Sequence, residues 1–335
     1  MHINSRSFVT LVIPAYNEEA ILENNIKIVV DYMRGLNKYD WEIILVNDGS
    51  LDNTEILANK CEKDIPEVRT IHHPINLNLG RALQTGFKNA KGDIIVVLDI
   101  DLSYSVEHIE ILVDKQIETH ADVVNASAYM KGGKVSNVPF GRALMSNIVN
   151  KFMHIAAQEH YYTFTGMVRA YKAEFIRNLN LKTKDYEINP EIMYKAMILR
   201  ARIEEIPAHL NWQSQKDIGK KRTSSIKVLK GVFSGLMSGF IFRPYIFFFA
   251  IGILALITSL YIMGWILFNT FQVYPEIVVA NNFFDDRFSA AVAKVYNERP
   301  YSFFVGGFNL IVAIQFLSLG FIALQNKRYF EETFH

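Results

Sequence analysis

Two carboxylates separated by a single residue, Asp99 and Asp101, are the side chains in this sequence best suited to chemistry. They follow residues 93–98, an apolar run that predicts a fully buried strand of a parallel sheet. The carboxyl ends of such strands border the crevice in which open α/β sheets bind ligands. Paired carboxylates suit Mg²⁺ or Mn²⁺, and such an ion would neutralise a diphosphate. An acidic pair alone is more often a solvated turn, so the interpretation depends on the elements around it.

Three strand–loop–helix units precede this pair. Residues 9–19 read as an apolar strand, a polar loop after Pro14 and the start of a helix. Residues 42–50 form a second buried strand that ends in an acidic, glycine-containing turn, and residues 77–83 form a loop that opens a helix. This recurrence is typical of βαβ units and predicts an α/β fold with a mainly parallel sheet.

The sequences of these segments resemble those of the family 2 glycosyltransferases. The motifs V-I-P-A-Y-N-E-E, L-V-N-D-G-S-x-D-N-T, N-L-G-R-A-L-Q-T-G and V-V-L-D-I-D-L follow one another within residues 9–103. The segments T-G-M-V-R-A-Y-K and N-P-E-I-M-Y-K-A, at residues 165–172 and 189–196, are similar to the polyprenyl-phosphate branch of that family. That branch includes dolichyl-phosphate mannose synthases and bacterial polyprenyl-phosphate glucosyltransferases. The resemblance covers about residues 8–230 and implies a GT-A fold, a Rossmann-like domain that binds a nucleotide sugar.

In this family the loops after the first two strands hold the nucleotide of the donor. The residues that the resemblance places at the base and ribose are Pro14, Ala15, Tyr16, Glu18 and Asp48. Gly80 and Arg81 open a helix, and the amide groups at its start are expected to face the donor phosphates.

The resemblance makes Asp99 and Asp101 the ligands of Mg²⁺ or Mn²⁺ and the holders of the diphosphate. Mannose synthases commonly have Gln two residues after the second Asp, whereas this chain has Ser103. A hydroxyl can bind a hard ion directly or through water, so Ser103 is the candidate third ligand. The departure weakens a specific assignment of mannose.

The acceptor side is expected to be cationic, because guanidinium groups match phosphate oxygens and stay charged. Arg142, Arg169 and Arg222 are the candidates, and Ser146 lies one helical turn after the first of them. Arg169 is also a candidate catalytic residue. If the acceptor were a hydroxyl, Asp185 or Glu187 could serve as the base.

Composition places the chain among two-part proteins. It has 335 residues, a net charge of +1 and 50% hydrophobic residues, which gives no reason to expect nucleic-acid binding. Cys61 is the single cysteine, which excludes an intramolecular disulfide and fits a reducing cytoplasmic setting. We expect no cleavable signal peptide, because the first apolar run is short and belongs to a strand.

Two carboxy-terminal runs without charged side chains, residues 245–268 and 302–324, are long enough to cross a bilayer. Basic residues flank the pair of runs and are sparse between them, which predicts cytoplasmic termini. The predicted organisation is a cytoplasmic GT-A domain (1–223), an interfacial amphipathic helix (224–243), spans at 244–268 and 302–324, an extracytoplasmic loop (269–301) and a cytoplasmic tail (325–335).

The sequence thus predicts an inverting, membrane-anchored transferase that moves a hexose from a donor of the UDP-glucose or GDP-mannose class to polyprenyl phosphate. One alternative is a membrane polysaccharide synthase, although no Q-x-x-R-W segment occurs. A nucleotidyltransferase would need a glycine-rich, basic first loop, and a catalytically idle membrane scaffold would not need Asp99, Asp101 and Arg169. Homo-oligomer formation is left open.

Overall fold

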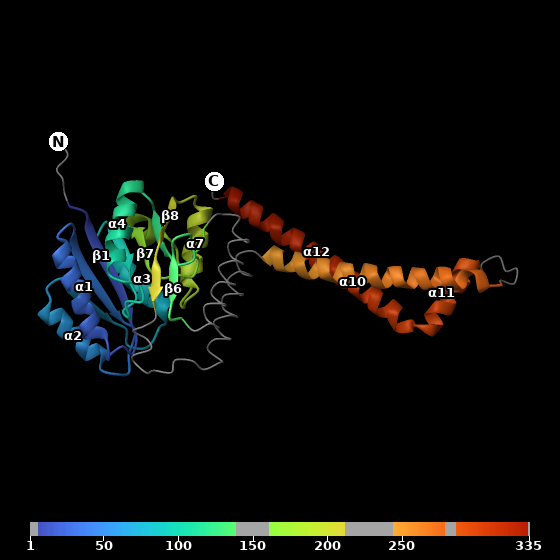
Figure 1. Cartoon of the computed structure of the whole chain (residues 1–335), viewed down its shortest axis with the longest axis horizontal. Helices are drawn as coiled ribbons and strands as arrows, with labels where there is room; N and C mark the ends of the chain where they lie inside the picture. Colours follow the sequence, from blue (N-terminus) through green and yellow to red (C-terminus); the bar gives the residue numbers. More distant parts are fainter. Residues whose placement is uncertain (1–5, 139–160, 212–243, 279–285, 334–335) are drawn as a thin grey trace. The chain divides into compact units, whose positions relative to one another are not determined.

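The computed structural model describes residues 6–138, 161–211, 244–278 and 286–333 (Figure 1). The chain divides into two units, Met1–Gly239 and Phe240–His335, which are described separately below. The amphipathic helix predicted at residues 224–243 lies outside the described residues, so it stays a prediction.

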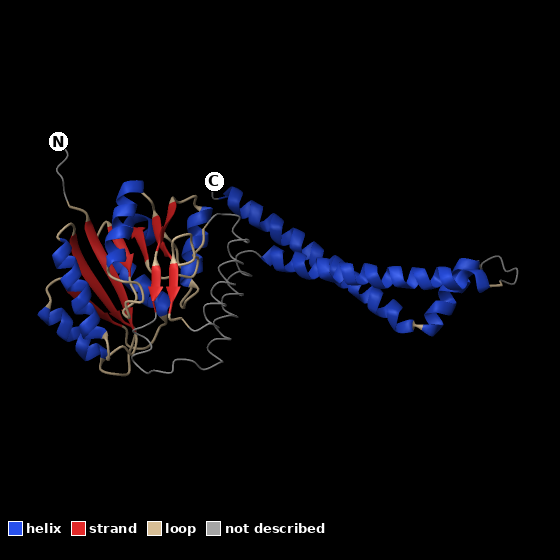
Figure 2. Cartoon of the chain, viewed as in Figure 1, coloured by secondary structure: helices blue, strands red, loops and turns tan. Residues whose placement is uncertain are grey.

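A mainly parallel sheet forms the centre of the first unit (Figure 2). Within the described residues its strand order is β3–β2–β1–β4–β7–β5–β8. The bounds are β1 (Phe8–Ala15), β2 (Asp40–Asn47), β3 (Val68–His72), β4 (Ile94–Val97), β5 (Val123–Ser127), β7 (Arg169–Lys172) and β8 (Ile203–Pro207). Every neighbouring pair is parallel except the two that include β7, which is antiparallel to β4 and to β5. The predicted α/β fold is therefore confirmed.

Helices cover both faces of this sheet. One apolar cluster includes residues of α1 (Leu22–Leu36), α2 (Thr54–Asp64) and α4 (Glu107–Thr119), and the other includes residues of α3 (Leu79–Asn89), α6 (Ala173–Asn178) and α7 (Ile188–Ile198). Strand β1 serves both clusters, since Leu11 faces the first and Val12 the second. Each such side chain stabilises the fold by about 1.5–3 kcal/mol when it is fully buried.

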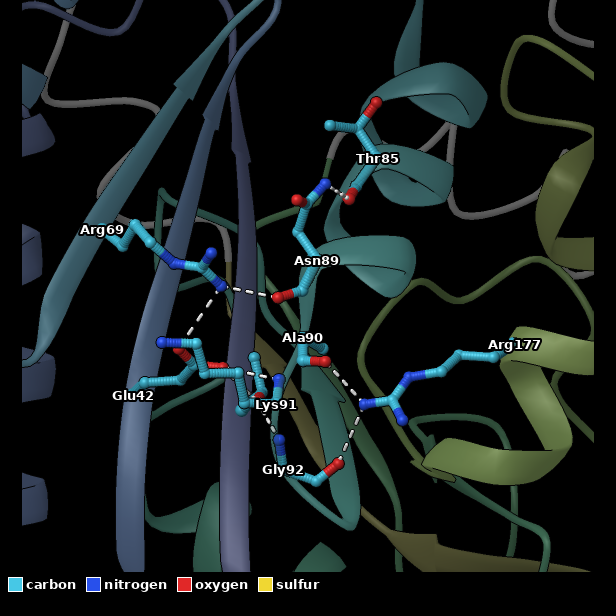
Figure 3. A network of polar contacts seen from close by, with 9 residues as sticks. Glu42, Arg69, Thr85, Asn89, Ala90, Lys91, Gly92 and Arg177 are labelled. Atoms are coloured by element: carbon cyan, nitrogen blue, oxygen red, sulfur yellow. Dashed lines mark hydrogen bonds and ion pairs between the residues drawn. The ribbon is translucent and has the colours of Figure 1, made fainter.

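A polar network fixes the amino-terminal end of the sheet (Figure 3). The buried carboxylate of Glu42 accepts hydrogen bonds from Thr10 Oγ1 (2.8 Å) and from the Lys91 amide (2.7 Å). Arg69 donates to the Asn89 carbonyl at 2.5 Å, and Arg177 donates to the Ala90 carbonyl at 2.6 Å. The turn between α3 and β4 is thus held at the end of the strands remote from Asp99.

The second unit is helical in its described part. Its elements are α10 (Pro244–Val273), the 3-10 helix η1 (Tyr274–Glu276), α11 (Arg287–Glu298) and α12 (Pro300–Thr333). By length and composition, Pro244–Glu276 and Pro300–Tyr329 could each cross a membrane, with mean hydropathies of 2.5 and 2.0. Only 11% of the most apolar window of each is buried, which argues against two core helices of a soluble protein.

The two long helices form an antiparallel hairpin. Gly252 lies against Leu317, and Gly320 lies against Phe249, so positions rise along one helix as they fall along the other. Ser259 donates to the carbonyl of Gly306 across the pair at 2.9 Å. Both helices run past the spans expected from the sequence, and α11 occupies part of the expected loop at 269–301.

Candidate active site

The predicted nucleotide residues lie at the carboxyl ends of β1 and β2. Pro14 and Ala15 end β1, and Tyr16, which is 38% exposed, begins the loop that follows. The Asp48 amide donates to the Ala15 carbonyl at 2.9 Å, so the two strand ends stay aligned up to their last residues. Glu18 follows in the same loop, and its amide donates to Thr54 Oγ1 at 2.8 Å.

Hydrogen bonds lock the loop after β1 to the loop after β2. The Asn17 amide donates to Ser50 Oγ at 2.9 Å, and Asn17 Oδ1 accepts from the Leu51 amide at 2.8 Å. Glu19 Oε2 accepts from the amide of Asn53 at 3.0 Å. Asn17 has a φ of 56°, a left-handed conformation that asparagine tolerates better than most residues. These two loops therefore present Tyr16 and Glu18 from one rigid frame.

Asp48 has a structural partner that the sequence did not suggest. Its side chain is buried, and Oδ1 lies 2.6 Å from His73 Nδ1 and accepts from the Leu77 amide at 3.0 Å. The adjacent Gly49 has a φ of +64°, and a Cβ there would lie 2.2 Å from the Ile75 carbonyl carbon. This carboxylate thus fixes the segment that leads into α3, and its contact with base or ribose stays a prediction.

Asp99 and Asp101 lie just after β4, whose last residue is Val97. Burial, together with the negative charges of Asp101 and Glu18, raises the pKa of Asp99 from 3.8 to about 8. Ser103 Oγ donates to Asp99 Oδ2 at 3.5 Å, and the Ser103 amide donates to Asp101 Oδ1 at 2.9 Å. Two carboxylates therefore lie at the end of β4 and are joined through Ser103, and the charge of Glu18 acts on Asp99 from the loop after β1.

This arrangement fits a divalent cation. A cation at Asp99 would remove the repulsion that disfavours its charged form. No group of three His, Cys, Asp or Glu with metal-site spacing occurs among the described residues. Two carboxylates and the Ser103 hydroxyl would thus leave positions for diphosphate oxygens and water, which is how Mg²⁺ is commonly bound at phosphate substrates.

The segment around Asp101 is tied to the strand β9 (His209–Asn211). The Asn211 amide donates to the Ser103 carbonyl at 2.8 Å, and Tyr104 forms a bridge with Leu210. β9 pairs with β6 (Lys134–Ser136) in a separate small sheet. The position of the acidic loop therefore depends on a pairing between residues more than a hundred positions apart.

Comparison with known proteins decides the family. Residues 10–179 match the glycosyl transferase family 2, which is half of the chain. The chain belongs to glycosyl transferase family 2. This confirms the family, and with it the enzyme class, that the four motifs predicted.

Two curated relatives of this family 2 chain come from its polyprenyl-phosphate branch. A dolichyl-phosphate beta-glucosyltransferase of Trichomonas vaginalis is 27% identical over 214 residues, which cover 61% of this chain and 66% of the relative. A dolichol-phosphate mannosyltransferase of Pyrococcus furiosus is 32% identical over 202 residues, which cover 59% of this chain and 55% of the relative. The chain thus spans between about half and two thirds of the length of these relatives.

The solved glucosyl-3-phosphoglycerate synthase of Mycobacterium tuberculosis has a similar fold, with a TM-score of 0.51 and 17% identity. The similarity covers 70% of this chain and 79% of that one. It confirms the GT-A architecture of the family 2 domain.

Gly80 and Arg81 have packing roles in this domain. A Cβ on Gly80 would lie 2.6 Å from the carbonyl carbon of Lys184, so the start of α3 packs closely against the backbone of the loop that contains Lys184. Arg81 Nη1 donates to Gln84 Oε1 at 2.8 Å, and Gln84 donates to the Thr183 carbonyl at 2.8 Å. Their predicted contact with donor phosphates has no direct support in these contacts and stays a prediction.

The structure does not place Arg169 where a phosphate contact was expected. Its side chain has no exposed surface, and it lies on β7, in the middle of the sheet. Nη1 donates to the Asn189 carbonyl at 3.1 Å, and Nη2 donates to the Phe164 carbonyl at 2.7 Å. The guanidinium therefore binds the segments that contain Asn189 and Phe164 to β7, and it has no exposed surface that a ligand could contact. The other acceptor candidates, Arg142, Ser146 and Arg222, lie outside the described residues.

Sequence reasoning missed Glu191, which organises the loop that carries Lys184. Its buried carboxylate accepts from the amides of Lys182 (2.8 Å) and Thr183 (2.9 Å) and pairs with Lys195 at 2.6 Å. These partners hold the pKa of Glu191 below its usual value although burial opposes them. Its place in the N-P-E-I motif was the available signal.

Proposed function

We propose that this chain transfers a hexose from a nucleotide sugar to a polyprenyl phosphate at a membrane surface, with inversion at the anomeric carbon. The observation that carries the proposal is the pair of carboxylates, Asp99 and Asp101, held through Ser103 at the carboxyl end of β4. It is supported by the two relatives, which are named for sugar transfer to dolichyl or dolichol phosphate.

The proposed acceptor determines what the protein must do. A phosphomonoester has a second pKa near ~6 and is largely dianionic at pH 7, so no strong general base is needed to activate it. An acceptor phosphate oxygen attacks the anomeric carbon while the bond from that carbon to the donor diphosphate breaks. The nucleoside diphosphate leaves with the bonding electron pair. The chain has to align the two reactants and stabilise the departing charge.

The described residues divide this work between them. Asp99 and Asp101, with the Ser103 hydroxyl, would hold Mg²⁺ or Mn²⁺, which supplies positive charge for the departing diphosphate. Tyr16, in the loop after β1, provides an exposed aromatic ring beside the expected base site. Arg142, Ser146 and Arg222 are still the predicted phosphate contacts of the acceptor.

The second unit would keep this chemistry at a membrane. Two helices of sufficient length and apolar character support an integral membrane protein. We further propose that the catalytic unit and both termini are cytoplasmic, because basic residues flank the pair of apolar runs. The donor is of the UDP-glucose or GDP-mannose class, and Ser103 in place of Gln gives no preference for mannose.

The test uses the full chain in detergent with labelled UDP-glucose or GDP-mannose, each with Mn²⁺ or with EDTA. Polyprenyl phosphate is the acceptor, and free polyprenol of the same length is the matched control. We expect metal-dependent transfer to the phosphate and none to the alcohol. Transfer to polyprenol or to an oligosaccharide would instead support a synthase that uses hydroxyl acceptors.

A further inference from the structure

Helix α12 has a second face that the hairpin does not use. Its inner face packs on α10 through Gly306, Ala313 and Gly320. On another side, exposed residues recur at alternating spacings of three and four. They are Tyr301, Phe304, Phe308, Ile311, Gln315, Ser318, Ile322 and Gln325. We call this set the outer stripe of α12. The 3–4 spacing is the seam pattern of helices that pair in a left-handed coil.

Gln315 lies near the middle of the expected span. It is two residues from the centre of the charge-free run 302–324, which is about 3 Å along a helix that rises about 1.5 Å per residue. Its side chain is too short to bring the amide from that depth to a headgroup region about 15 Å away. A primary amide at this depth is costly unless its donors and acceptor find partners.

Several other polar side chains of the two helices have such partners. Thr258 donates to the Leu254 carbonyl at 2.9 Å, and Asn309 donates to the Val305 carbonyl at 2.9 Å. Ser259 donates across the hairpin to Gly306. Gln315 is exposed, and among the described residues its side-chain amide forms no hydrogen bond with either helix.

We infer that the outer stripe of α12 binds the same stripe of a second copy of this chain in the membrane. Copies inserted in one orientation present parallel α12 helices, so equivalent residues meet at a two-fold axis. An amide carries both donor and acceptor, and Gln315 of each copy can therefore satisfy the other. One turn away, the small side chain of Ser318 lets the backbones approach closely. This inference depends on membrane insertion but not on which sugar or acceptor is used.

The first experiment maps the contact by cysteine cross-linking. Gln315→Cys is made in a Cys61→Ser background and reconstituted as the full chain in phosphatidylcholine vesicles. Leu254→Cys is the matched control, since Leu254 is 67% exposed on α10 and lies at the same depth, given that Gly252 opposes Leu317. With copper phenanthroline and oxygen as the oxidant, the two thiols give up two electrons and form one disulfide. We expect cross-linked dimer from Gln315→Cys and little from Leu254→Cys.

The second experiment measures the amide itself. Dimer fraction is followed by energy transfer between labelled chains as they are diluted in the vesicles. Gln315→Leu should weaken dimerisation about 3- to 20-fold, the range measured for hydrogen bonds between membrane helices. Gln315→Asn should retain most of it, and Ile314→Leu, beside the stripe, should behave as the parent chain.

Three results would overturn the inference. They are equal cross-linking at both cysteines, an unchanged dimer fraction in Gln315→Leu, and a chain that is monomeric at every dilution. If Gln315→Cys in native membranes forms a disulfide with a protein of different mass and no cross-linked dimer, a different protein covers the stripe and the second copy is excluded. Sugar transfer by the same variants is measured separately, so failure of the proposed function would not be mistaken for failure of this inference.

Discussion

Replacing Asp99 with Asn is expected to stabilise the metal-free protein at neutral pH while it abolishes activity. In the folded chain the pKa of Asp99 is about 8, compared with 3.8 for an ordinary Asp. Folding therefore favours the protonated carboxyl, and it costs free energy at any pH where the group is ionised in the unfolded chain. This free-energy cost is absent below about pH 3.8 and grows as the pH rises toward 8. At pH 7 the unfolded chain would have this group ionised and the folded chain would not. The interval of about three pH units between 3.8 and 7, at about 1.4 kcal/mol for each unit, makes this cost about 4 kcal/mol at pH 7.

An amide resembles the protonated carboxyl and has no charge to lose. Asp99→Asn should therefore unfold at a higher temperature at pH 7, by about 8–16 °C for a domain of about 200 residues, and at nearly the same temperature at pH 4. The measurement is thermal unfolding of the full chain in detergent with EDTA between pH 4 and pH 8. Mn²⁺ with a nucleoside diphosphate should reduce this difference in unfolding temperature, because it stabilises the parent chain by about 2.7 kcal/mol at a hundredfold excess over Kd.

Asp31→Asn, which changes an exposed aspartate of α1, is the control and should follow the parent chain at every pH. The reasoning is refuted if Asp99→Asn loses stability with rising pH as steeply as the parent does. It is also refuted if Asp99→Asn keeps normal turnover, because the buried carboxylate would then not be needed for the cation.

Three further outcomes are expected. Asp101→Asn should lower turnover at least a hundredfold without lowering the unfolding temperature, since it removes a metal contact, and normal kinetics at saturating Mn²⁺ would contradict this. Arg169→Ala should destabilise the fold by about 3 kcal/mol or more, because two buried carbonyls lose charged donors. In the fraction of the protein that remains folded, the KM for polyprenyl phosphate should be unchanged. A raised KM for polyprenyl phosphate at normal stability would instead support the phosphate contact that the sequence predicted for Arg169. In a Cys61→Ser background, a cysteine at Val278, which is 93% exposed, should react with an impermeant thiol reagent in intact cells, whereas one at Leu51, which is 89% exposed, should not. The opposite labelling would invert the topology.

The strand ends could be placed from the sequence because two independent signals agreed there. Apolar runs of strand length ended at Pro14, Asp48 and Asp99, and each was followed by residues typical of a turn or a helix start. In the structure β1, β2 and β4 end at or next to these positions and lie side by side. The gathering of their loops follows from parallel pairing, so it required no knowledge of side-chain contacts.

Arg169 shows where such reasoning fails. Its motif indicated the right family. The sequence of a four-residue strand, however, does not show which two strands it pairs with or whether the pairing is parallel or antiparallel. The antiparallel insertion of β7 between β4 and β5 sets Arg169 opposite Val97 and Asn125 and buries it completely. An arginine predicted to be a ligand contact thus became a brace, because long-range pairing, rather than local pattern, decided its exposure.

The loop that carries Asp99 and Asp101 depends both on local sequence pattern and on long-range contacts. The sequence identified Asp99 and Asp101, but a further negative charge that acts on Asp99 comes from Glu18, more than eighty residues earlier. Glu18 is kept near them because its amide is bound by Thr54 and its loop is bound by the turn after β2. The negative charges around Asp99 and its desolvation disfavour the ionised carboxylate, and a bound cation would remove part of this free-energy cost. A site built in this way would give up stability in the metal-free state in order to bind charge, which agrees with the proposed role of a cation in neutralising a departing diphosphate.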